Sequence, residues 1–376
     1  MSPLRFSRLR GALAVAAAGA LALTLTACGG SAGSASSTSA AATSAASAAS
    51  AASSAASGSA QASGSTQASG SAGATTGYPV TITHAFGQTV IDSAPQRVAT
   101  WGWGSTDAVL ALGVVPVAMP SFASFGGNTE GVMPWAADKL TELGAATPTI
   151  LPNEGTDAPI EQILATKPDV LLAQYSGLTQ LEYDRLTQGG VKVVTYPQTA
   201  WSTPWRDVIT TTGEVLGKSA ETAALLENID ATVAERAAAN PEFGGKTIAT
   251  AAILGGTFYV YLPADPRVQF TEDLGFTSAD SVTALDTKED TFYFTLSAEQ
   301  FGSLTADVLL IYAATDEEID TFLATPEAKL LPQVDGGKIV RVTGEAEVAS
   351  VSPPTALSLT WGVDSFVDDI KTGLAA

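Results

Sequence analysis

The chain has 376 residues, of which 38 are Asp or Glu and 18 are Lys or Arg, so its formal net charge is −20. Nucleic-acid binding is disfavoured, because a phosphate backbone requires a basic protein surface. One cysteine cannot form an internal disulfide, and one histidine leaves the chain short of the usual transition-metal ligands.

The N-terminus predicts export. Three arginines within the first ten residues precede an apolar run from Ala12 to Leu25, and the segment Leu25-Thr-Ala-Cys28 follows. A basic region, a short apolar region and a small-residue cleavage site form an export signal, and the run is below the roughly 20 residues of a spanning helix. Its end resembles a bacterial lipobox. We predict a signal peptide at 1–27, lipidation of Cys28, and attachment to the extracytoplasmic face of the cell membrane; an ordinary signal peptide with a coincidental cysteine is the alternative.

Residues 28–77 follow the predicted cleavage site and consist almost entirely of Ser, Ala, Gly, Thr and Gln, without a charged or large apolar residue. Such a segment cannot bury enough surface to offset the entropy of ordering it. We expect a flexible tether with a mean reach of about 40 Å.

Strands and helices alternate after the tether, which is typical of parallel sheets. In the first part we predict strands at 97–101, 170–173 and 191–195, an extended segment at 114–119, and helices at 108–112 and 179–188. Asp157 is predicted to cap a further helix that has Pro159 in its first turn. The middle is helical, with helices at 203–216 and 219–240. The second is amphipathic, because Leu226, Ile229 and Val233 recur at helical spacing.

The last part repeats the alternation. We predict strands at 247–254, 258–261 and 338–342, a helix at 266–274, and a final helix that follows Pro353-Pro354 and runs toward Leu374. The predicted fold is α/β, with two Rossmann-like lobes of parallel-rich sheets joined by one long helix and a ligand cleft between the lobes. The predicted bounds are 78–205 for the N-terminal lobe, 206–243 for the helical segment and 244–376 for the C-terminal lobe.

Two segments read almost alike: Glu161-Gln-Ile-Leu-Ala-Thr-Lys-Pro-Asp169-Val-Leu-Leu-Ala173 and Glu299-Gln-Phe-Gly-Ser-Leu-Thr-Ala-Asp307-Val-Leu-Leu-Ile311. Each predicts a short helix with a Glu near its start, a turn, and a strand buried on both faces. One lobe built twice explains the likeness; the general similarity of helix-to-strand units in layered proteins is the alternative.

Several segments resemble the substrate-binding lipoproteins of bacterial ABC importers for iron–siderophore complexes, whose two lobes are joined by a rigid helix. The matching segments are Thr100–Val117, Lys167–Thr179, Pro204-Trp-Arg206, Pro263–Phe270 and Ser350–Gly362. The Lys-Pro-Asp element is widespread in this class, whereas Trp101-Gly-Trp103 and Ser352-Pro-Pro-Thr355 narrow the resemblance to the siderophore branch. The resemblance implies a monomer that binds an Fe(III)–siderophore complex and delivers it to a dimeric ABC permease.

The resemblance also gives the repeated glutamates a role. Similar proteins dock one acidic residue of each lobe into a basic pocket of the permease, and Glu161 and Glu299 stand at the matching positions. Complementary charges of this kind fix the register of a complex and speed encounter. The alternative is that both are solvated carboxylates at helix starts.

The ligand is expected between the lobes, where strand ends and helix N-termini meet. Aromatic and arginine side chains suit a bulky chelate, because aromatic faces pack against its apolar arms and guanidinium groups bond its oxygens. The candidates are Trp101, Trp103, Tyr175, Trp205, Arg206, Tyr261, Arg267 and Tyr293, each of which has a structural role as its alternative.

Overall acidity and few candidate arginines favour a hydroxamate or mixed chelate over an anionic tris-catecholate. Haem and cobalamin are the alternative ligands within the class, and a secreted carboxylate-based hydrolase is the alternative outside it. We predict no catalytic residue, no resident cofactor and no protein metal site. A phosphate-binding loop at 213–219 is rejected because it is one residue short and joins two helices, and Gly102-Trp-Gly104 lacks the third glycine of a dinucleotide fingerprint.

Overall fold

The computed structural model of the protein describes residues 77–153, 155, 157–288, 290, 292–336 and 338–376, which all belong to one compact unit. The predicted signal peptide, Cys28 and the predicted tether up to residue 76 lie outside the described residues. Within the described part of the chain, no helix is both long and apolar enough to cross a membrane.

The N-terminal lobe is built on a five-stranded parallel sheet with the strand order β5-β4-β3-β6-β7. The strands are β3 (Val98–Thr100), β4 (Ala118–Pro120), β5 (Thr149–Leu151), β6 (Val170–Ala173) and β7 (Lys192–Thr195). The helices are α1 (Ser105–Ala111), the 3-10 turn η1 (Ala123–Phe125), α2 (Pro134–Glu142), α3 (Ile160–Ala165) and α4 (Gln180–Gln188). The strands predicted around β3, β6 and β7 are confirmed, while the segment predicted at 114–119 joins the sheet only from Ala118.

The C-terminal lobe has a six-stranded mixed sheet of order β11-β9-β8-β12-β13, with β10 also paired to β8. Its strands are β8 (Thr247–Leu254), β9 (Thr257–Tyr261), β10 (Thr277–Ser278), β11 (Tyr293–Thr295), β12 (Val308–Tyr312) and β13 (Ile339–Val342). Its helices are α7 (Pro266–Asp273), α8 (Asp280–Leu285), α9 (Asp316–Leu323), α10 (Pro332–Gly336), α11 (Glu345–Val351) and α12 (Ser358–Ala375), with the 3-10 turns η2 (Pro241–Phe243), η3 (Ala298–Ser303) and η4 (Ala328–Leu330). Parallel pairing holds for β8, β12 and β13, so the parallel-rich α/β prediction is confirmed.

The antiparallel part of this sheet comes from one tight turn. Gly255 and Gly256 connect β8 to β9 and have φ angles of 58° and 80°. Two successive residues of positive φ form the hairpin turn whose twist matches that of the strands, and glycine adopts this conformation without steric cost. The turn folds β9 back onto β8, and β11 then pairs with β9 in the same antiparallel sense.

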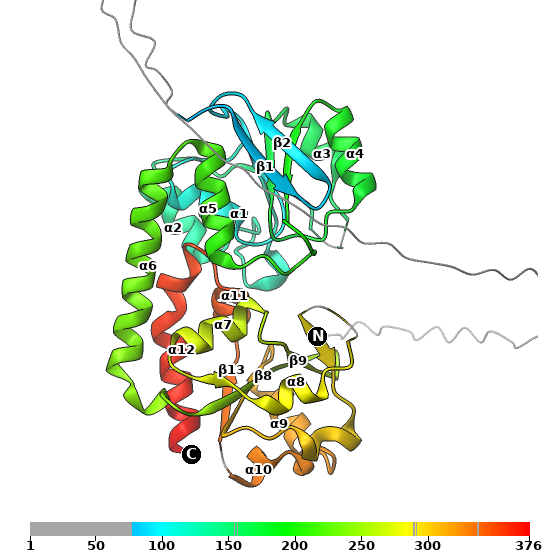
Figure 1. Ribbon diagram of the computed structural model, residues 1–376, viewed down its shortest axis with the longest axis vertical. Helices are drawn as coiled ribbons and strands as arrows, with labels where there is room; N and C mark the ends of the chain where they lie inside the picture. The colour runs from blue at the N-terminus through cyan, green and yellow to red at the C-terminus, as the bar shows by residue number, and fades with distance from the viewer. Residues whose placement is uncertain (1–76, 154, 156, 289, 291, 337) are drawn as a thin grey trace, which may run out of the picture. The chain divides into compact units, whose positions relative to one another are not determined.

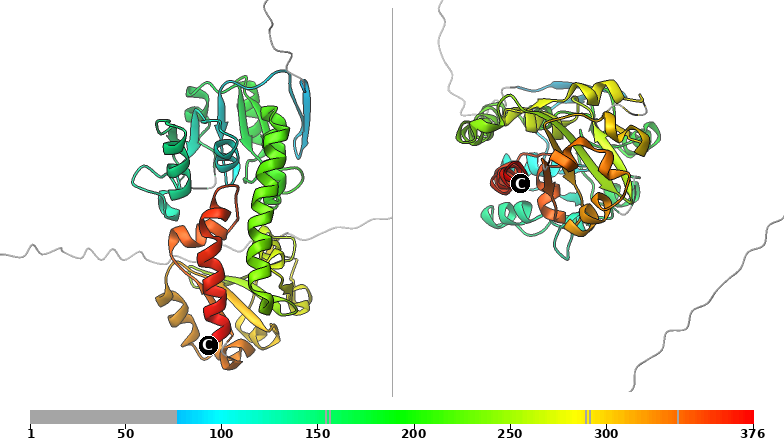
Figure 2. Two further views of the ribbon diagram at one scale, coloured as in Figure 1. Left: turned by 90° about the vertical axis from the view of Figure 1, so that its left-hand side faces the viewer. Right: turned by 90° about the horizontal axis from the view of Figure 1, so that it is seen from below.

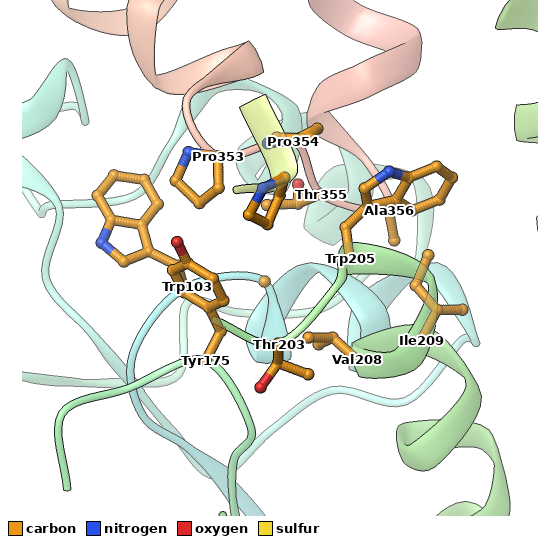
Figure 3. A pocket seen from close by; sticks show the side chains of 12 residues that line it. Trp103, Tyr175, Thr203, Trp205, Val208, Ile209, Pro353, Pro354, Thr355 and Ala356 are labelled. Atoms are coloured by element: carbon orange, nitrogen blue, oxygen red, sulfur yellow. The ribbon is translucent and has the colours of Figure 1, made fainter. Parts of the chain in front are cut away.

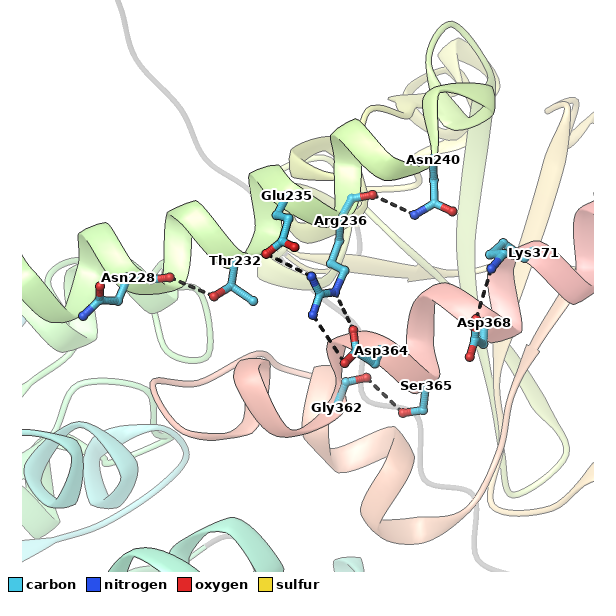
Figure 4. Close-up of polar contacts among 10 residues, drawn as sticks. All are labelled: Asn228, Thr232, Glu235, Arg236, Asn240, Gly362, Asp364, Ser365, Asp368 and Lys371. Atoms are coloured by element: carbon cyan, nitrogen blue, oxygen red, sulfur yellow. Dashed lines mark hydrogen bonds and ion pairs between the residues drawn. The ribbon is translucent and has the colours of Figure 1, made fainter.

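The long predicted helix is α6 (Ser219–Ala239), which follows α5 (Trp205–Leu216) and spans about 31 Å at 1.5 Å per residue. Ile229 and Val233 of its predicted apolar stripe are buried, and Leu226 is half-buried. Figures 1 and 2 show α6 running beside both lobes, with α12 next to it. Arg236 of α6 pairs with two carboxylates, that of its neighbour Glu235 in the same helix and that of Asp364 in α12 (Figure 4).

A further hairpin, β1 (Val80–His84) with β2 (Gly87–Ile91), precedes the N-terminal sheet and was not predicted. The single histidine of the chain lies in it. His84 is buried, its Nε2 is 2.9 Å from Thr89 Oγ1, and its ring packs against Tyr183. The histidine is therefore a packing residue.

The two similar segments make the same kind of contact in both lobes: an aspartate before a buried strand bonds the start of the neighbouring strand. Strands β6 and β12 are fully buried, and each stands in the interior of its sheet. Asp169, just before β6, accepts hydrogen bonds from the backbone N–H groups of Gln96 and Arg97 ahead of β3. Asp307, just before β12, accepts from the N–H and hydroxyl of Thr247 at the start of β8, both at 2.8 Å. Each aspartate thus ties its own strand to the start of its parallel neighbour.

Two details of these segments differ from the prediction. Helix α3 begins after Pro159, which is its N-cap and offers no side-chain capping bond, so Asp157 does not cap it. Proline lacks a backbone N–H and tolerates this position, where that donor has no helical partner. The second segment forms the 3-10 turn η3 rather than an α-helix.

We expect Asp307→Ala to lower the free energy of unfolding by about 1 kcal/mol at neutral pH, because Thr247 loses the acceptor of two hydrogen bonds at a solvated site. Those bonds lower the pKa of Asp307 from its ordinary 3.8. A lowered folded-state pKa stabilises above the unfolded value and is lost as pH falls through the folded one. The difference from wild type in urea unfolding should therefore shrink as pH falls below the ordinary pKa of 3.8. Asp335→Ala, an exposed acid on α10, is the control; equal losses in both variants would contradict the assignment.

Candidate functional site

A cavity of about 390 Å³ lies between the lobes. The side chains of the N-terminal lobe that line it all follow the carboxyl ends of parallel strands. They are Trp103 after β3, Ser124 and Phe125 after β4, Tyr175 after β6, and Trp201 after β7. The C-terminal lobe contributes the last residues of β8, β9 and β12, a residue of α7, the residue before β11, and residues of α11 and of the segment after it. They include Leu254, Tyr261, Arg267, Phe292, Tyr312, Glu345, Val348, Ser352 and Pro353.

Seven of the described residues that line the cavity are aromatic. Trp103 packs on Phe122 with ring centroids 4.6 Å apart, and Phe125 meets it edge to face at 5.2 Å. Tyr175 meets Trp201 in the same way at 5.9 Å. Aromatic pairs of this geometry hold each other rigidly, so the wall presents fixed ring faces and edges to a ligand.

Arg267 is the cation of the cavity lining. Its guanidinium lies 4.5 Å from the ring centre of Tyr261, pairs with Asp265 at 2.7 Å and donates to Ser352 Oγ at 2.7 Å. Burial acts to lower the pKa of Arg267, but the charges of Asp265, Tyr261 and Tyr175 and the hydrogen bond to Asp265 together outweigh burial and hold the pKa well above its ordinary value. Asp265 also accepts the backbone N–H of Arg267 and so caps α7. The arginine is therefore charged and held in one orientation.

The structure brings together four of the eight residues predicted to contact a ligand: Trp103, Tyr175, Tyr261 and Arg267. The other four lie outside the lining. Trp101 belongs to the buried core of the N-terminal sheet. Trp205 is also buried, and the guanidinium of Arg206 lies 4.1 Å from the centre of its ring. Arg206 itself pairs with Asp230 and Asp273. Tyr293 packs against Tyr259 and Phe292.

Sequence reasoning did not single out Phe125, Trp201, Phe292, Tyr312 or Glu345. A signal for the first two was present, because each follows a strand of a parallel sheet and the carboxyl ends of such strands share one edge. Trp201 also has a φ of 59°, a conformation that is unusual for a residue with a side chain. Glu345 follows β13 through the turn at Gly344, and nothing in its local sequence marks it.

The lobes meet directly behind the cavity. Figure 3 shows Pro353 and Pro354 of the C-terminal lobe between Trp103 and Trp205 of the N-terminal lobe. The crevice that these residues line has a volume of about 10 Å³, room for about one water molecule. This region is a closed contact between the lobes rather than a ligand site.

A buried carboxylate links the lobes beside this contact. Asp107 of α1 accepts a hydrogen bond from Trp135 Nε1 at 2.7 Å and another from the hydroxyl of Thr355, in the other lobe. Burial raises the pKa of Asp107 from 3.8 to about 6, although both hydrogen bonds act in the opposite direction. Trp135 also packs against Trp361 of α12, with ring centroids 5.3 Å apart.

Glu161 and Glu299 lie on different lobes, and both are exposed. Each stands in the first turn of its helical segment, α3 or η3. The pKa of Glu299 is lowered by hydrogen bonds from its own backbone N–H and from Ser297. The described residues contain no group of three or more His, Cys, Asp or Glu side chains arranged to hold a metal ion.

The chain is similar to known proteins in sequence and in structure. The family model for periplasmic binding proteins matches residues 98–346. The chain is 30% identical to the iron-uptake ABC transporter substrate-binding protein PiaA of Streptococcus pneumoniae, with a TM-score of 0.69 over 78% of this chain and 99% of that one. It is 31% identical to the same protein solved with ferrichrome, with a TM-score of 0.70 over 78% and 98% of the two chains.

A periplasmic solute binding protein from Mycobacterium smegmatis is 28% identical, with a TM-score of 0.65 over 78% of this chain and 98% of that one. No curated protein sequence matches the chain. The match covers nearly the whole length of each of these similar structures, so it extends to both lobes.

We expect the contribution of Asp107 to the stability of the wild type to fall by up to roughly 3 kcal/mol as pH rises from about 4 to about 6. The folded-state pKa of Asp107 is raised, so the protonated carboxyl stabilises the folded state below the unfolded pKa and this contribution is lost as pH rises through about 6. Asp107→Asn cannot ionise, so urea unfolding measured across that range should show a shallower slope; the part that remains comes from other groups, such as Asp369, whose pKa burial also raises to about 6. Asp207→Asn, an exposed acid on α5, should keep the full slope. An unchanged slope in Asp107→Asn would contradict the assignment.

Proposed function

Because this chain belongs to the periplasmic binding protein family, we propose that it is an extracytoplasmic substrate-binding lipoprotein that captures a ferric siderophore and delivers it to an ABC importer. The observation that carries the proposal is the cavity between the lobes. Its volume of about 390 Å³ and its aromatic wall with one arginine suit a compact chelate with apolar arms. The likeness to PiaA, solved with ferrichrome, supports the same ligand class.

The ligand contacts we propose are Trp103, Tyr175, Tyr261 and Arg267, which all line the cavity. The arginine donates to chelate oxygens, and the aromatic rings pack against the chelate arms. The proposed contacts leave out four of the predicted residues because they lie outside the lining: Trp101, Trp205, Arg206 and Tyr293. Binding without turnover is the expected behaviour, as for the substrate-binding relatives.

Export and anchoring complete the proposal. The N-terminal sequence motif supports a signal peptide at 1–27 and lipidation of Cys28, with residues 28–77 as the tether. We propose lobes at 78–205 and 244–376 joined by the helical segment 206–243, which contains α6. A tether of this length would let the lobes reach a membrane permease while the chain stays attached.

The proposed ligand class is tested by titrating the full-length protein with ferrichrome and following its tryptophan fluorescence. We expect saturable quenching, and we expect Trp103→Ala to weaken binding by about tenfold or more, because it removes a large ring from the cavity wall. Leu181→Ala, at an exposed position of α4, should leave affinity unchanged. No response to any ferric chelate, with a response to haem or cobalamin, would refute the siderophore assignment.

We further propose that Glu161 and Glu299 dock the loaded protein onto the permease, one from each lobe. Both are exposed at the same position of a repeated segment, each nine positions before the start of a fully buried strand. A buried strand fixes the backbone that carries each carboxylate, so the spacing of the two charges is set by the fold. Paired charges at a fixed spacing are suited to recognition by a two-fold symmetric partner.

We expect the double variant Glu161→Ala, Glu299→Ala to bind chelate normally and to lose about tenfold or more of iron uptake, because a rim charge governs encounter and register rather than ligand affinity. Uptake of radioactive iron by cells that depend on this protein measures the effect. The matched control removes two other exposed acids, Glu221 and Glu317. Full uptake by the docking variant would refute the role.

A further inference from the structure

Two charged side chains line the cavity among the described residues: Arg267 and Glu345. They differ in burial and in partners. The side chain of Arg267 is only 12% exposed, and its Nη1 lies 2.7 Å from the carboxylate of Asp265, whose side chain has no solvent exposure. Glu345 is exposed, and the described residues offer it no ion pair.

The positive charge of Arg267 is therefore compensated within the protein, whereas the negative charge of Glu345 is not. A compensated arginine still donates hydrogen bonds to a ligand oxygen, but its long-range attraction for an anion is largely cancelled by the carboxylate beside it. Counted together, Asp265, Arg267 and Glu345 leave the lining with one net negative charge. The net acidity of the chain acts in the same direction.

A contact between the lobes positions the backbone beside Glu345. It is the first residue of α11, after Gly344 with a φ of 95°. The next residue, Ala346, lies against Gly126 of the opposite lobe so closely that a Cβ on Gly126 would stand 2.4 Å from the Ala346 backbone nitrogen. Phe125, beside Gly126, lines the same cavity. Glu345 therefore lies beside a contact between the two lobes, at the side of the cavity.

We propose that Glu345 sets the charge selectivity of the cavity: it favours neutral and cationic ferric chelates, above all trihydroxamates that carry a protonated amine, and disfavours anionic tris-catecholates. The inference rests on the proposed siderophore function and specifies the class of chelate. A carboxylate beside the cavity attracts an ammonium group and repels a trianion, and the water-poor surroundings of a filled cleft strengthen both effects.

A structural role alone makes a different prediction. Glu345 and Glu347 both lie in the first turn of α11, where a carboxylate interacts favourably with the helix dipole. Glu347 does not line the cavity. If the dipole were the only role of Glu345, the two residues would be equivalent in binding experiments, so Glu347→Gln is the matched control.

The test measures dissociation constants of the full-length protein for three ferric chelates: a linear trihydroxamate with a protonated amine, neutral ferrichrome and a trianionic tris-catecholate. We expect affinity to fall in that order in the wild type and the order to weaken at high salt. Glu345→Gln should lower the preference for the cationic over the anionic chelate by about tenfold, and Glu345→Lys should reverse it. Glu347→Gln should behave as wild type.

Two results would overturn the inference. Equal affinities of the wild type for the three chelates, independent of salt, would remove charge selectivity while leaving the siderophore function intact. Equal effects of Glu345→Gln and Glu347→Gln would assign the selectivity to another group. Failure of all three chelates to bind the wild type would instead refute the proposed function itself, and with it the inference.

Discussion

Parallel pairing of the central strands is the constraint on which the rest of this structure depends. β3 pairs with β6 in one lobe and β8 with β12 in the other, and parallel strands place their carboxyl ends along one edge of a sheet. Side chains from segments far apart in the sequence meet at those edges. Trp103 and Tyr175 come from two such ends in the first lobe, and Leu254 and Tyr312 come from two in the second.

The repeated aspartates serve this pairing. Asp169 and Asp307 sit one residue before a buried strand and hold the start of the neighbouring parallel strand through its backbone N–H groups. A parallel pair has no connecting hairpin to fix its register, so a side-chain bond at the strand start is one way to set it. The similarity of the two sequence segments thus has a structural cause as well as the proposed docking role of Glu161 and Glu299.

The site was partly predictable, and the reasons differ between residues. Trp101 and Trp103 stand two positions apart, yet the first is buried in the sheet core and the second lines the cavity. Gly102 between them has a φ of 78°, and a Cβ there would lie 2.3 Å from the carbonyl oxygen of Tyr175. The sequence shows the glycine and the two tryptophans. It does not show the close approach of Gly102 to Tyr175, which directs one tryptophan into the core and the other to the cavity. Arg206 and Arg267 look alike in sequence, and only their partners distinguish them.

The sequence by itself determined the alternation of strands and helices, the bridging helix, the buried strands and the repeat, because these follow from hydrophobic periodicity and local backbone preferences. The tertiary structure decided which charges face the cavity and which are neutralised. Thr355 meets Asp107 from 248 residues away, and Glu345 reaches the cavity through a contact between lobes. Such encounters depend on how whole sheets and helices pack, and no local pattern in the chain carries that information.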